Sequence, residues 1–379
     1  MAQRNILRTG AALILALVFL AAAPCPARAA APRVTSSAAV LVDAGTGQVY
    51  FAKNHRVRCE PASLTKLMTA VVALENGNLN DVVTVGSQAA AIAEGTTIDL
   101  RKGDKITLDE LLQAALICSA NDSTVAIAEH VGGSHSQFID MMNKKAAALG
   151  MFGTRYVNTN GYHHPNHYTT AYDLAILTRY ALGHPRINEL VQTREETVSW
   201  LEPEKTRKIG NTNRLLQGLY EGTDGVKTGT TAKAGNCLIA SATKDGRRLI
   251  AVALNSNDRY RDCINMFDYG FKTLQTVTLI AAGQTAASPA VTGGGSLSVQ
   301  AVAEKDLQAR LDPGDLTGLR QRIDLPEVVP APIKEGQKLG ELVYTLGEQE
   351  LGRVNLVAGA SVPKRSWPSQ LWERIFIKT

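Results

Sequence analysis

The sequence predicts an α+β fold, in which strands from both ends of a catalytic region form one antiparallel sheet packed against a helical block. A hairpin pattern at residues 37–52 opens this region, and two strongly apolar strands at 237–242 and 249–254 lie near its end. Between them, apolar residues recur mostly at helical spacing. A sheet whose strands flank a run of helices buries its apolar face against those helices. We therefore expect a catalytic domain at 30–274, followed by a small all-β domain at 275–360.

Length and charge limit the classes of function. The chain has 379 residues, which favours two domains, and 45% of them are hydrophobic, enough to form buried cores. The formal net charge is +5, but Arg4, Arg8 and Arg28 lie in the first 29 residues, so the rest carries only +2. No basic cluster with interleaved aromatic residues occurs along the chain, so we expect no nucleic-acid partner.

Residues 1–29 have the pattern of a secretory signal peptide. A basic start precedes the apolar run at 11–23, and Ala27-Arg28-Ala29 is a small-x-small cleavage site. The apolar run is too short for an ordinary membrane span. We therefore expect export of a bacterial type, to the outer face of the cytoplasmic membrane, in the periplasm or cell-wall space.

Cysteine usage leaves the redox state open and gives no sign of a metal. Four cysteines follow the predicted cleavage site: Cys59, Cys118, Cys237 and Cys263. Their even number and an oxidising compartment permit disulfides, whereas the apolar surroundings of Cys118 and Cys237 favour small core residues. No Cys-x-x-Cys spacing occurs, and three nearby histidines lie in a polar loop rich in Asn and Pro. We expect no zinc site and no cofactor.

The first half of the chain alternates short extended segments with helices. Strands are expected at 37–43 and 48–52, and short strands or extended connectors at 82–85 and 96–100. Helices are expected from Pro61 onward and at 108–117, 123–131, 138–150 and 171–182. Thr107 and Glu110 form a capping-box pattern at the start of the 108–117 helix. Gly183-His184-Pro185 ends the 171–182 helix.

The second half begins with a polar region, up to about residue 221, to which we assign no element. The strands 237–242 and 249–254 are joined through Lys244-Asp245-Gly246, a hairpin signal, and a helix at 264–274 closes the domain. Beyond it, we expect short strands at 297–302, 320–325, 342–345 and 353–358, with a helical turn near 304–311.

Residues 361–379 form a tail of a different kind. Its large apolar residues recur at helical spacing: Trp367, Leu371, Trp372, Ile375 and Phe376. The helical part is too short to cross a bilayer, but an amphipathic segment with tryptophan suits the membrane interface. We expect the tail to associate with a membrane surface, the alternative being a helix docked on its own domain.

Three short motifs carry the chemistry: Ser63-x-x-Lys66, Ser119-x-Asn121 and Lys227-Thr228-Gly229. A serine hydroxyl is a weak nucleophile near pH 7 and needs a base beside it. A lysine provides that base only if burial or another cation lowers its pKa. Each motif is weak evidence alone, but the three in this order are the set found in penicillin-binding proteins and class A β-lactamases.

With these motifs, the chain resembles the low-molecular-mass penicillin-binding proteins, the serine D-alanyl-D-alanine carboxypeptidases of the cell wall. Further stretches support the resemblance, at residues 166–171, 223–225 and 267–271. It extends over nearly the whole chain, from the signal peptide to the amphipathic tail. It implies a β-lactamase-like catalytic domain, peptidoglycan stem peptides as substrate, and β-lactam antibiotics as covalent inhibitors.

The resemblance also implies roles for the motif residues. Ser63 would attack the carbonyl between two D-alanines, and Lys66 would take its proton, kept neutral with the help of Lys227 nearby. Ser119 would relay a proton to the departing D-alanine. Asn121 would either bond the substrate amide or hold Lys66.

A second group of residues would bind the substrate. Lys227 would face its terminal carboxylate, with the hydroxyl of Thr228 or Thr230 beside it. Backbone N–H groups of Ser63 and Thr230 would form an oxyanion hole, and Gly229 would leave room for a substrate lying along the strand. Arg259 or Arg261 would either add a carboxylate contact or face solvent.

The chain departs from the family pattern at Asn160-Gly161, where the family often carries His-Gly. The resemblance also leaves three other functions open. An endopeptidase that cuts cross-linked stems would use the same residues, and a catalytically dead scaffold would be expected to lack one of them. A β-lactamase would need a glutamate loop soon after Ser119, but Glu202-Pro203-Glu204 lies 83 residues further on and lacks the Leu-Asn that follows in that loop.

Overall fold

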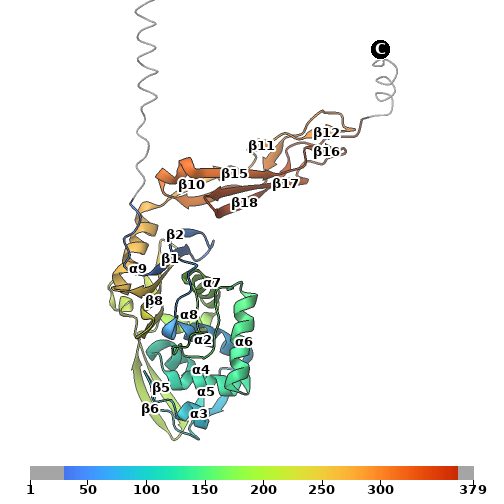
Figure 1. Cartoon of the computed structure of the whole chain (residues 1–379). Coiled ribbons are helices and arrows are strands. Elements are labelled where there is room, and N and C mark those ends of the chain that lie inside the picture. Colours follow the sequence, from blue (N-terminus) through green and yellow to red (C-terminus); the bar gives the residue numbers. More distant parts are fainter. Residues whose placement is uncertain (1–29, 366–379) are drawn as a thin grey trace, which may run out of the picture. The chain divides into compact units, whose positions relative to one another are not determined.

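The computed structural model describes residues 30–365, and both the predicted signal peptide and the tail from Trp367 lie outside the described residues (Figure 1). The described chain divides into two compact units, Ala31–Lys272 and a second that begins at Thr273. Each is described by itself. Within residues 30–365, no helix has both the length and the apolar character needed to cross a membrane.

The first unit is built on the antiparallel sheet that the sequence predicts from its two ends. The strand order is β2-β1-β9-β8-β7. The bounds are β1 Ala38–Asp43, β2 Val49–Lys53, β7 Thr223–Thr231, β8 Gly235–Lys244 and β9 Arg247–Ser256. The first strand pairs with the last one, with Val40 opposite Val252. This long-range pairing joins the ends of the unit and leaves β7 at one edge of the sheet.

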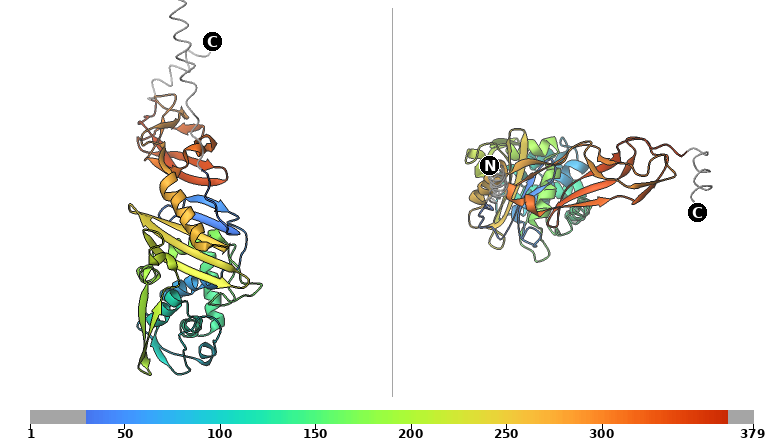
Figure 2. Two further views of the ribbon diagram at one scale, coloured as in Figure 1. Left: turned by 90° about the vertical axis from the view of Figure 1, so that its left-hand side faces the viewer. Right: turned by 90° about the horizontal axis from the view of Figure 1, so that it is seen from above.

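The two faces of the sheet contact different helices. Alternate residues of β1 separate cleanly: Val40 packs into the large core on the helical block, whereas Leu41 packs into a second core with α9 (Arg259–Asp268). Figures 1 and 2 show α9 on one side of the sheet and the helical block on the other. Two of the three motifs, at Ser63 and Ser119, lie in the helical block, and the third lies on the edge strand β7.

The helical block follows the predicted order with shifted ends. Its helices are α2 Lys66–Asn76, α3 Ser87–Ala90, α4 Leu108–Gln113, α5 Asn121–Gly132, α6 His135–Ala148, α7 Ala171–Ala181 and α8 Pro185–Gln192. Thr107 caps α4 as predicted, accepting a bond from Glu110 N at 3.2 Å. A π-helical turn, Ala114–Cys118, then prolongs α4 up to Ser119. Helix α5 starts at Asn121 rather than 123, so the break between helices is only Ser119 and Ala120.

The polar region before β7 is structured, which the sequence analysis did not anticipate. Pro185, interpreted as a stop, occupies the first turn of α8, where its missing N–H costs no helical bond. Strands β5 (Glu195–Glu202) and β6 (Lys205–Gly210) then join β3 (Val82–Thr84) and β4 (Lys105–Thr107) in a four-stranded sheet. Most side chains of β5 and β6 are exposed or only partly buried, so these strands lack the apolar alternation that marks a strand in a sequence.

One further expectation needs correction, and the cysteine question is answered. The closing helix α9 begins at Arg259, five residues before the expected start, because Asp258 caps it by accepting from Arg261 N at 3.0 Å. Residues 96–100, expected to be a short strand or an extended connector, form no strand, which agrees with the connector. The four described cysteines are free thiols, and Cys237 and Cys263 are fully buried.

The second unit is rich in strands, as predicted. Its main sheet has the order β11-β13-β18-β17-β15. The bounds are β10 Gln275–Ile280, β11 Thr285–Ala287, β12 Ala290–Thr292, β13 Ala301–Ala303, β14 Leu307–Leu311, β15 Leu319–Asp324, β16 Val328–Pro330, β17 Lys338–Leu346 and β18 Gln349–Ala358. The predicted helical turn near 304–311 is wrong. Alternate residues Ala309 and Leu311 are buried there, and β14 pairs with β10.

Candidate active site

A hollow of about 140 Å³ lies where the helical block meets the edge strand β7. The first two motifs contribute Ser63, Ser119 and Asn121 to its lining, and Thr230, which follows the third motif, lies on it as well. Its lining comprises Ser63, Gly95, Thr96, Ser119, Asn121, Asn160, Gly161, Tyr162, Thr230 and Thr231. The fold therefore assembles one site from the start of α2, the break before α5, the loop before α7, and β7.

Ser63 lies on a 3-10 turn, η1 (Ala62–Thr65), which leads directly into α2. Its Oγ is 2.9 Å from Nζ of Lys66, the first residue of α2. The preceding residue, Ala62, has a left-handed backbone with φ of 48°. Such a conformation costs a non-glycine residue about 1–2 kcal/mol, and it persists only where surrounding contacts impose it.

Lys66 is completely buried, and three oxygen atoms surround its amine. Besides Ser63 Oγ, these are Asn121 Oδ1 at 2.7 Å and the Asn160 carbonyl oxygen at 3.2 Å. Burial lowers the pKa of Lys66 far below its usual value, and the charge of Lys227 lowers it further. A neutral amine has two N–H bonds, which the two carbonyl oxygens accept. Its lone pair then remains for the Ser63 hydroxyl.

Asn121 connects the Lys66 amine to the segment of Glu94 and Thr96 through hydrogen bonds. While Oδ1 accepts from Lys66, Nδ2 donates to the Glu94 carbonyl oxygen at 2.7 Å, and its backbone N donates to Thr96 O at 2.7 Å. Of the two roles considered for Asn121, the geometry therefore corresponds to holding Lys66.

Ser119 lines the same hollow as Ser63 and has a left-handed backbone, with φ of 67° and ψ of 33°. It ends the π-helical turn, and its backbone N–H bonds to Ala114 O. This sharp turn separates α4 from α5 and directs Ser119 away from the regular path of a helix. Ala62 and Ser119 thus both have left-handed backbones beside a motif. At both places, packing overrides the backbone conformation that these residues prefer.

Lys227 is also buried, with 1% of its surface exposed, and its Nζ donates to Thr228 O at 3.3 Å. Burial is the main cause that lowers its pKa, to about 7, and the charge of Arg259 adds to the effect. The site therefore contains two amines whose protonated forms are disfavoured by the same dry environment.

The remaining predicted site residues divide into two groups. The Thr230 hydroxyl accepts from Arg259 Nη1 at 2.8 Å, and the same nitrogen donates to Gly229 O at 3.0 Å, so Arg259 is fixed against β7. Thr228 instead shares a hydrogen bond of 2.5 Å with the Thr212 hydroxyl and is largely buried. Arg261 is exposed. Of the two arginines considered, Arg259 is thus the one beside the site.

Two glycines allow the chain to close around Ser63. A Cβ on Gly161, whose φ is +91°, would lie 1.7 Å from Ala62 O. A Cβ on Gly229 would lie 3.1 Å from both Pro61 O and Ser63 N. A side chain at Gly229 would therefore crowd the serine segment where it approaches β7. Its expected role in leaving room for the substrate stays a prediction.

The sequence analysis did not identify several residues of the hollow. Asn160 contributes its backbone carbonyl, and Tyr162 has a raised pKa because of burial and a hydrogen bond to the Glu94 carboxylate. Gly95 and Thr96 lie in a bend that contains no recognised motif. The only signal was Asn160-Gly161 itself, which was noted as a departure from the family pattern.

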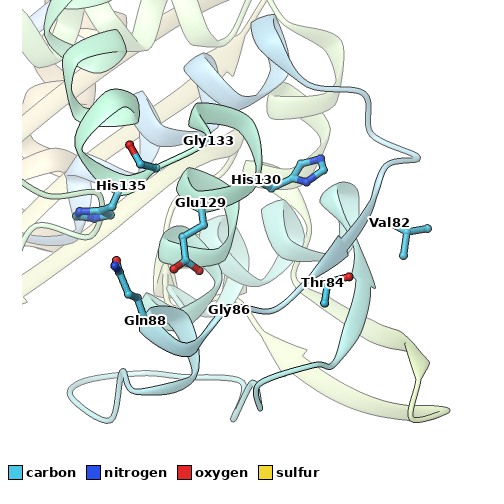
Figure 3. A pocket seen from close by; sticks show the side chains of 9 residues that line it. Val82, Thr84, Gly86, Gln88, Glu129, His130, Gly133 and His135 are labelled. Atoms are coloured by element: carbon cyan, nitrogen blue, oxygen red, sulfur yellow. The ribbon is translucent and has the colours of Figure 1, made fainter.

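A larger hollow, of about 560 Å³, lies at the opposite end of α5 (Figure 3). It contains none of the motif residues. Figure 3 shows the Glu129 carboxylate directed toward the segment of Gly86 and Gln88. Burial raises the pKa of Glu129, and its carboxylate accepts from the backbone N of Ala89. This carboxylate is engaged with the start of the short helix α3, and the hollow is distinct from the candidate active site.

Fold and site together define an active-site serine enzyme of the Ser-x-x-Lys class. Comparison with known families agrees. The family model described as D-alanyl-D-alanine carboxypeptidase matches residues 26–258, and the model of the C-terminal domain of penicillin-binding protein 5 matches 274–364. The chain belongs to the serine-type D-alanyl-D-alanine carboxypeptidases, the low-molecular-mass penicillin-binding proteins.

Individual relatives are similar over most of the chain. D-alanyl-D-alanine carboxypeptidase DacF of Bacillus subtilis is 34% identical, over 87% of this chain and 86% of its own length. DacC of Escherichia coli is 32% identical, over 92% and 89%. The crystal structure of penicillin-binding protein 5 from Haemophilus influenzae matches with a TM-score of 0.70 and 28% identity, covering 89% of this chain and all of that one.

Replacing Gly161 by Ala tests the closure around Ser63. The new Cβ would force Ala62 and Ser63 to move, and we expect the rate of acylation by labelled penicillin to fall by about a hundredfold. Gly103→Ala is the matched control, since Gly103 also has a positive φ, +88°, but its Cβ would face open space. Equal acylation rates in the two variants would contradict the idea that Gly161 is needed for the close approach to Ala62 and Ser63.

The buried amine of Lys227 makes a testable contribution to stability. Below pH 7 both folded and unfolded states hold the proton, so the folded state bears the full cost of a buried charge. That cost disappears as pH rises from the folded pKa of about 7 to the unfolded value of 10.5. Lys227→Met should therefore be more stable than the parent by a few kcal/mol at pH 6, and the gain should shrink toward pH 10.

Urea unfolding of the parent and Lys227→Met at several pH values measures this difference. Titrating groups that do not interact with Lys227 cancel in the comparison. Lys66 does not cancel, because Lys227→Met removes a charge that lowers its pKa. A gain in the free energy of unfolding that stays constant from pH 6 to pH 10 would show that Lys227 is not the source.

Proposed function

We propose that the chain removes the terminal D-alanine from peptidoglycan pentapeptide stems through an acyl-enzyme on Ser63. One observation carries this proposal: the Ser63 hydroxyl lies 2.9 Å from a completely buried amine, Lys66. The activity serves peptidoglycan biosynthesis, and through it cell-wall biogenesis and cell shape.

In the first step, Ser63 Oγ attacks the carbonyl carbon between the two D-alanines. Lys66 accepts the hydroxyl proton, because its amine is neutral and its lone pair faces the serine. Ser119, in the same hollow, gives its hydroxyl proton to the nitrogen of the departing D-alanine and takes up the proton held by Lys66, so that the amine is neutral again. Lys66 then accepts a proton from the water that attacks the ester, and this proton returns to Ser63 Oγ as the acid product leaves.

The opposite side of the hollow receives the charges of the substrate. Lys227 supplies positive charge to the terminal carboxylate, with Thr228 or Thr230 beside it, and Arg259 adds a second cation through its contact with Thr230. Backbone N–H groups of Ser63 and Thr230 stabilise the oxyanion. The same arrangement would accept a β-lactam, whose strained amide acylates Ser63.

Endopeptidase action on cross-linked stems is the second candidate. A D-alanyl-D-alanine endopeptidase of Pseudomonas aeruginosa is 32% identical but covers only 68% of this chain. The relatives that cover about nine-tenths of it are carboxypeptidases, which favours trimming of free stems. Release of D-alanine from a pentapeptide, compared with cleavage of a cross-linked dimer, separates the two.

A β-lactamase is the least favoured of the alternatives. Its catalytic glutamate would have to reach the acyl-enzyme, but Glu202 ends strand β5 and forms an ion pair with Lys105 at 2.9 Å. The residues that line the hollow around Ser63 do not include it.

Intact-mass measurement after exposure to labelled penicillin tests the mechanism directly. We expect the parent to gain one covalent adduct and Ser63→Ala to gain none. Ser136→Ala, which alters an exposed serine on α6, should label like the parent. An adduct on Ser63→Ala, or none on the parent, would refute the acyl-enzyme proposal.

We place the enzyme at the outer face of the bacterial cytoplasmic membrane. Support comes from the leader pattern at residues 1–29 and from the apolar spacing of the tail after Trp367. Two signals of this kind would export the chain and then hold it at the surface on which stem peptides are presented.

Shortening the chain tests the anchor. A chain that ends at Lys364 should shift from the membrane pellet to the soluble fraction, because it lacks the apolar residues of the tail. Its rate on a soluble D-Ala-D-Ala peptide should be unchanged. Retention on membranes equal to that of the full chain would rule out anchoring by the tail.

A further inference from the structure

A cluster of arginine and tyrosine residues lies beside the turn that carries Ser63. We call it the basic-aromatic face, and it consists of Arg56, Arg58, Arg155, Tyr168 and Tyr172. All three arginines are exposed. Its members come from two segments about a hundred residues apart, so the sequence alone shows no cluster.

Short backbone pairings build this face. Cys59 pairs with Thr169, and Arg155 pairs with Tyr168, both in antiparallel bridges. Residues directly opposite each other in such pairs have side chains on the same side, so Arg155 and Tyr168 lie together. Farther along, Tyr172 N donates to His55 O at 2.9 Å, which brings the segment of Arg56 against the start of α7.

Aromatic rings hold two of the guanidinium groups. Cζ of Arg58 lies 4.4 Å from the centre of the Tyr168 ring, and Cζ of Arg56 lies 4.3 Å from the centre of the Tyr172 ring. Stacking on a ring restricts an arginine without using its N–H groups. Those groups stay free for an external acceptor.

The face also lacks neutralising acids. No Asp or Glu occurs between Asp43 and Glu60, or between Asp140 and Asp173. Of the nearest acids along the chain, Glu60 pairs with His163 at 2.8 Å, and Asp173 is buried and accepts from the Thr154 hydroxyl. Within residues 30–365, no carboxylate forms an ion pair with any of the three arginines.

The face is fixed to the turn of the nucleophile. Arg58 precedes Ser63 by five residues, so their Cα atoms lie at most about 18 Å apart. His167, next to Tyr168, forms a hydrogen bond of 2.9 Å between its Nε2 and the hydroxyl of Thr65, two residues after Ser63. A polymer with one stem at Ser63 therefore has further groups within reach of the face.

We propose that the basic-aromatic face binds carboxylates of the peptidoglycan polymer outside the stem that enters the active site. This inference rests on the proposed function, which supplies the polymer. Peptidoglycan stems carry free carboxylates, and the planar guanidinium group pairs with a carboxylate through two parallel hydrogen bonds. The face thereby directs the enzyme to polymeric wall rather than to free peptide.

The test compares two substrates with the full chain: a soluble N-acylated tripeptide ending in D-Ala-D-Ala, and insoluble peptidoglycan with pentapeptide stems. The variant is Arg56→Gln, Arg58→Gln and Arg155→Gln together. The matched control is Arg33→Gln, Arg101→Gln and Arg194→Gln, which removes the same charge from exposed arginines of the same unit. Sedimentation with peptidoglycan measures binding without catalysis.

We expect the face variant to lose about eightfold in kcat/KM on peptidoglycan, since each exposed charge pair is worth a factor of about two. Its kcat/KM on the tripeptide should stay within twofold of the parent, and the control should match the parent on both substrates. Amidation of the peptidoglycan carboxylates should reduce sedimentation of the parent to the level of the face variant.

Three results would overturn the proposal: equal rates of face variant and parent on peptidoglycan, an equal loss in the control, or an equal loss on the tripeptide. Sedimentation unaffected by amidation would also overturn it. Absence of D-alanine release from the tripeptide by the parent would refute the proposed function instead, and sedimentation would still test the face.

Discussion

The burial of the Lys66 amine is the constraint on which the rest of the site depends. A charged amine in this environment is strongly disfavoured, and a neutral one still needs acceptors for its N–H bonds. Asn121 and Asn160 provide them from two separate loops. Those loops must therefore close tightly on α2, which explains the left-handed turns at Ala62 and Ser119 and the absence of a side chain at Gly161.

Much of this arrangement was predictable, because each motif is short and its residues lie on one local turn, helix start or strand. A single antiparallel sheet built from both ends of the catalytic region followed from the apolar runs there, whereas the order of its strands was not predicted. The sequence did not show which cause lowers the pKa of Lys66 most. We expected burial or a second cation to lower the pKa of Lys66, with help from Lys227, and the structure ranks the two: desolvation by burial is the larger effect and the charge of Lys227 the smaller. A sequence shows that two lysines exist, but not how dry their surroundings are.

The parts that sequence reasoning missed share a physical origin. Strands β5 and β6 gain their order from pairing with β3 and β4, not from a continuous apolar face. The basic-aromatic face arises only when residues 55–59 meet residues 155–172. Arg259 was one of two candidate arginines, and its bond to Thr230 depends on where α9 begins, which the capping residue Asp258 decides. Each feature depends on contacts between distant segments.

The contact from Asn160 to the catalytic amine is made by a peptide carbonyl, while its side chain accepts from Tyr162 N at 3.1 Å. The chemical group offered to Lys66 is therefore the same for every amino acid at this position. A different amino acid at position 160 would therefore still offer a backbone carbonyl to Lys66, provided that Gly161 is kept. A method that ranks residues by side-chain identity would overlook a position that acts through its main-chain carbonyl. Backbone geometry is what reveals it.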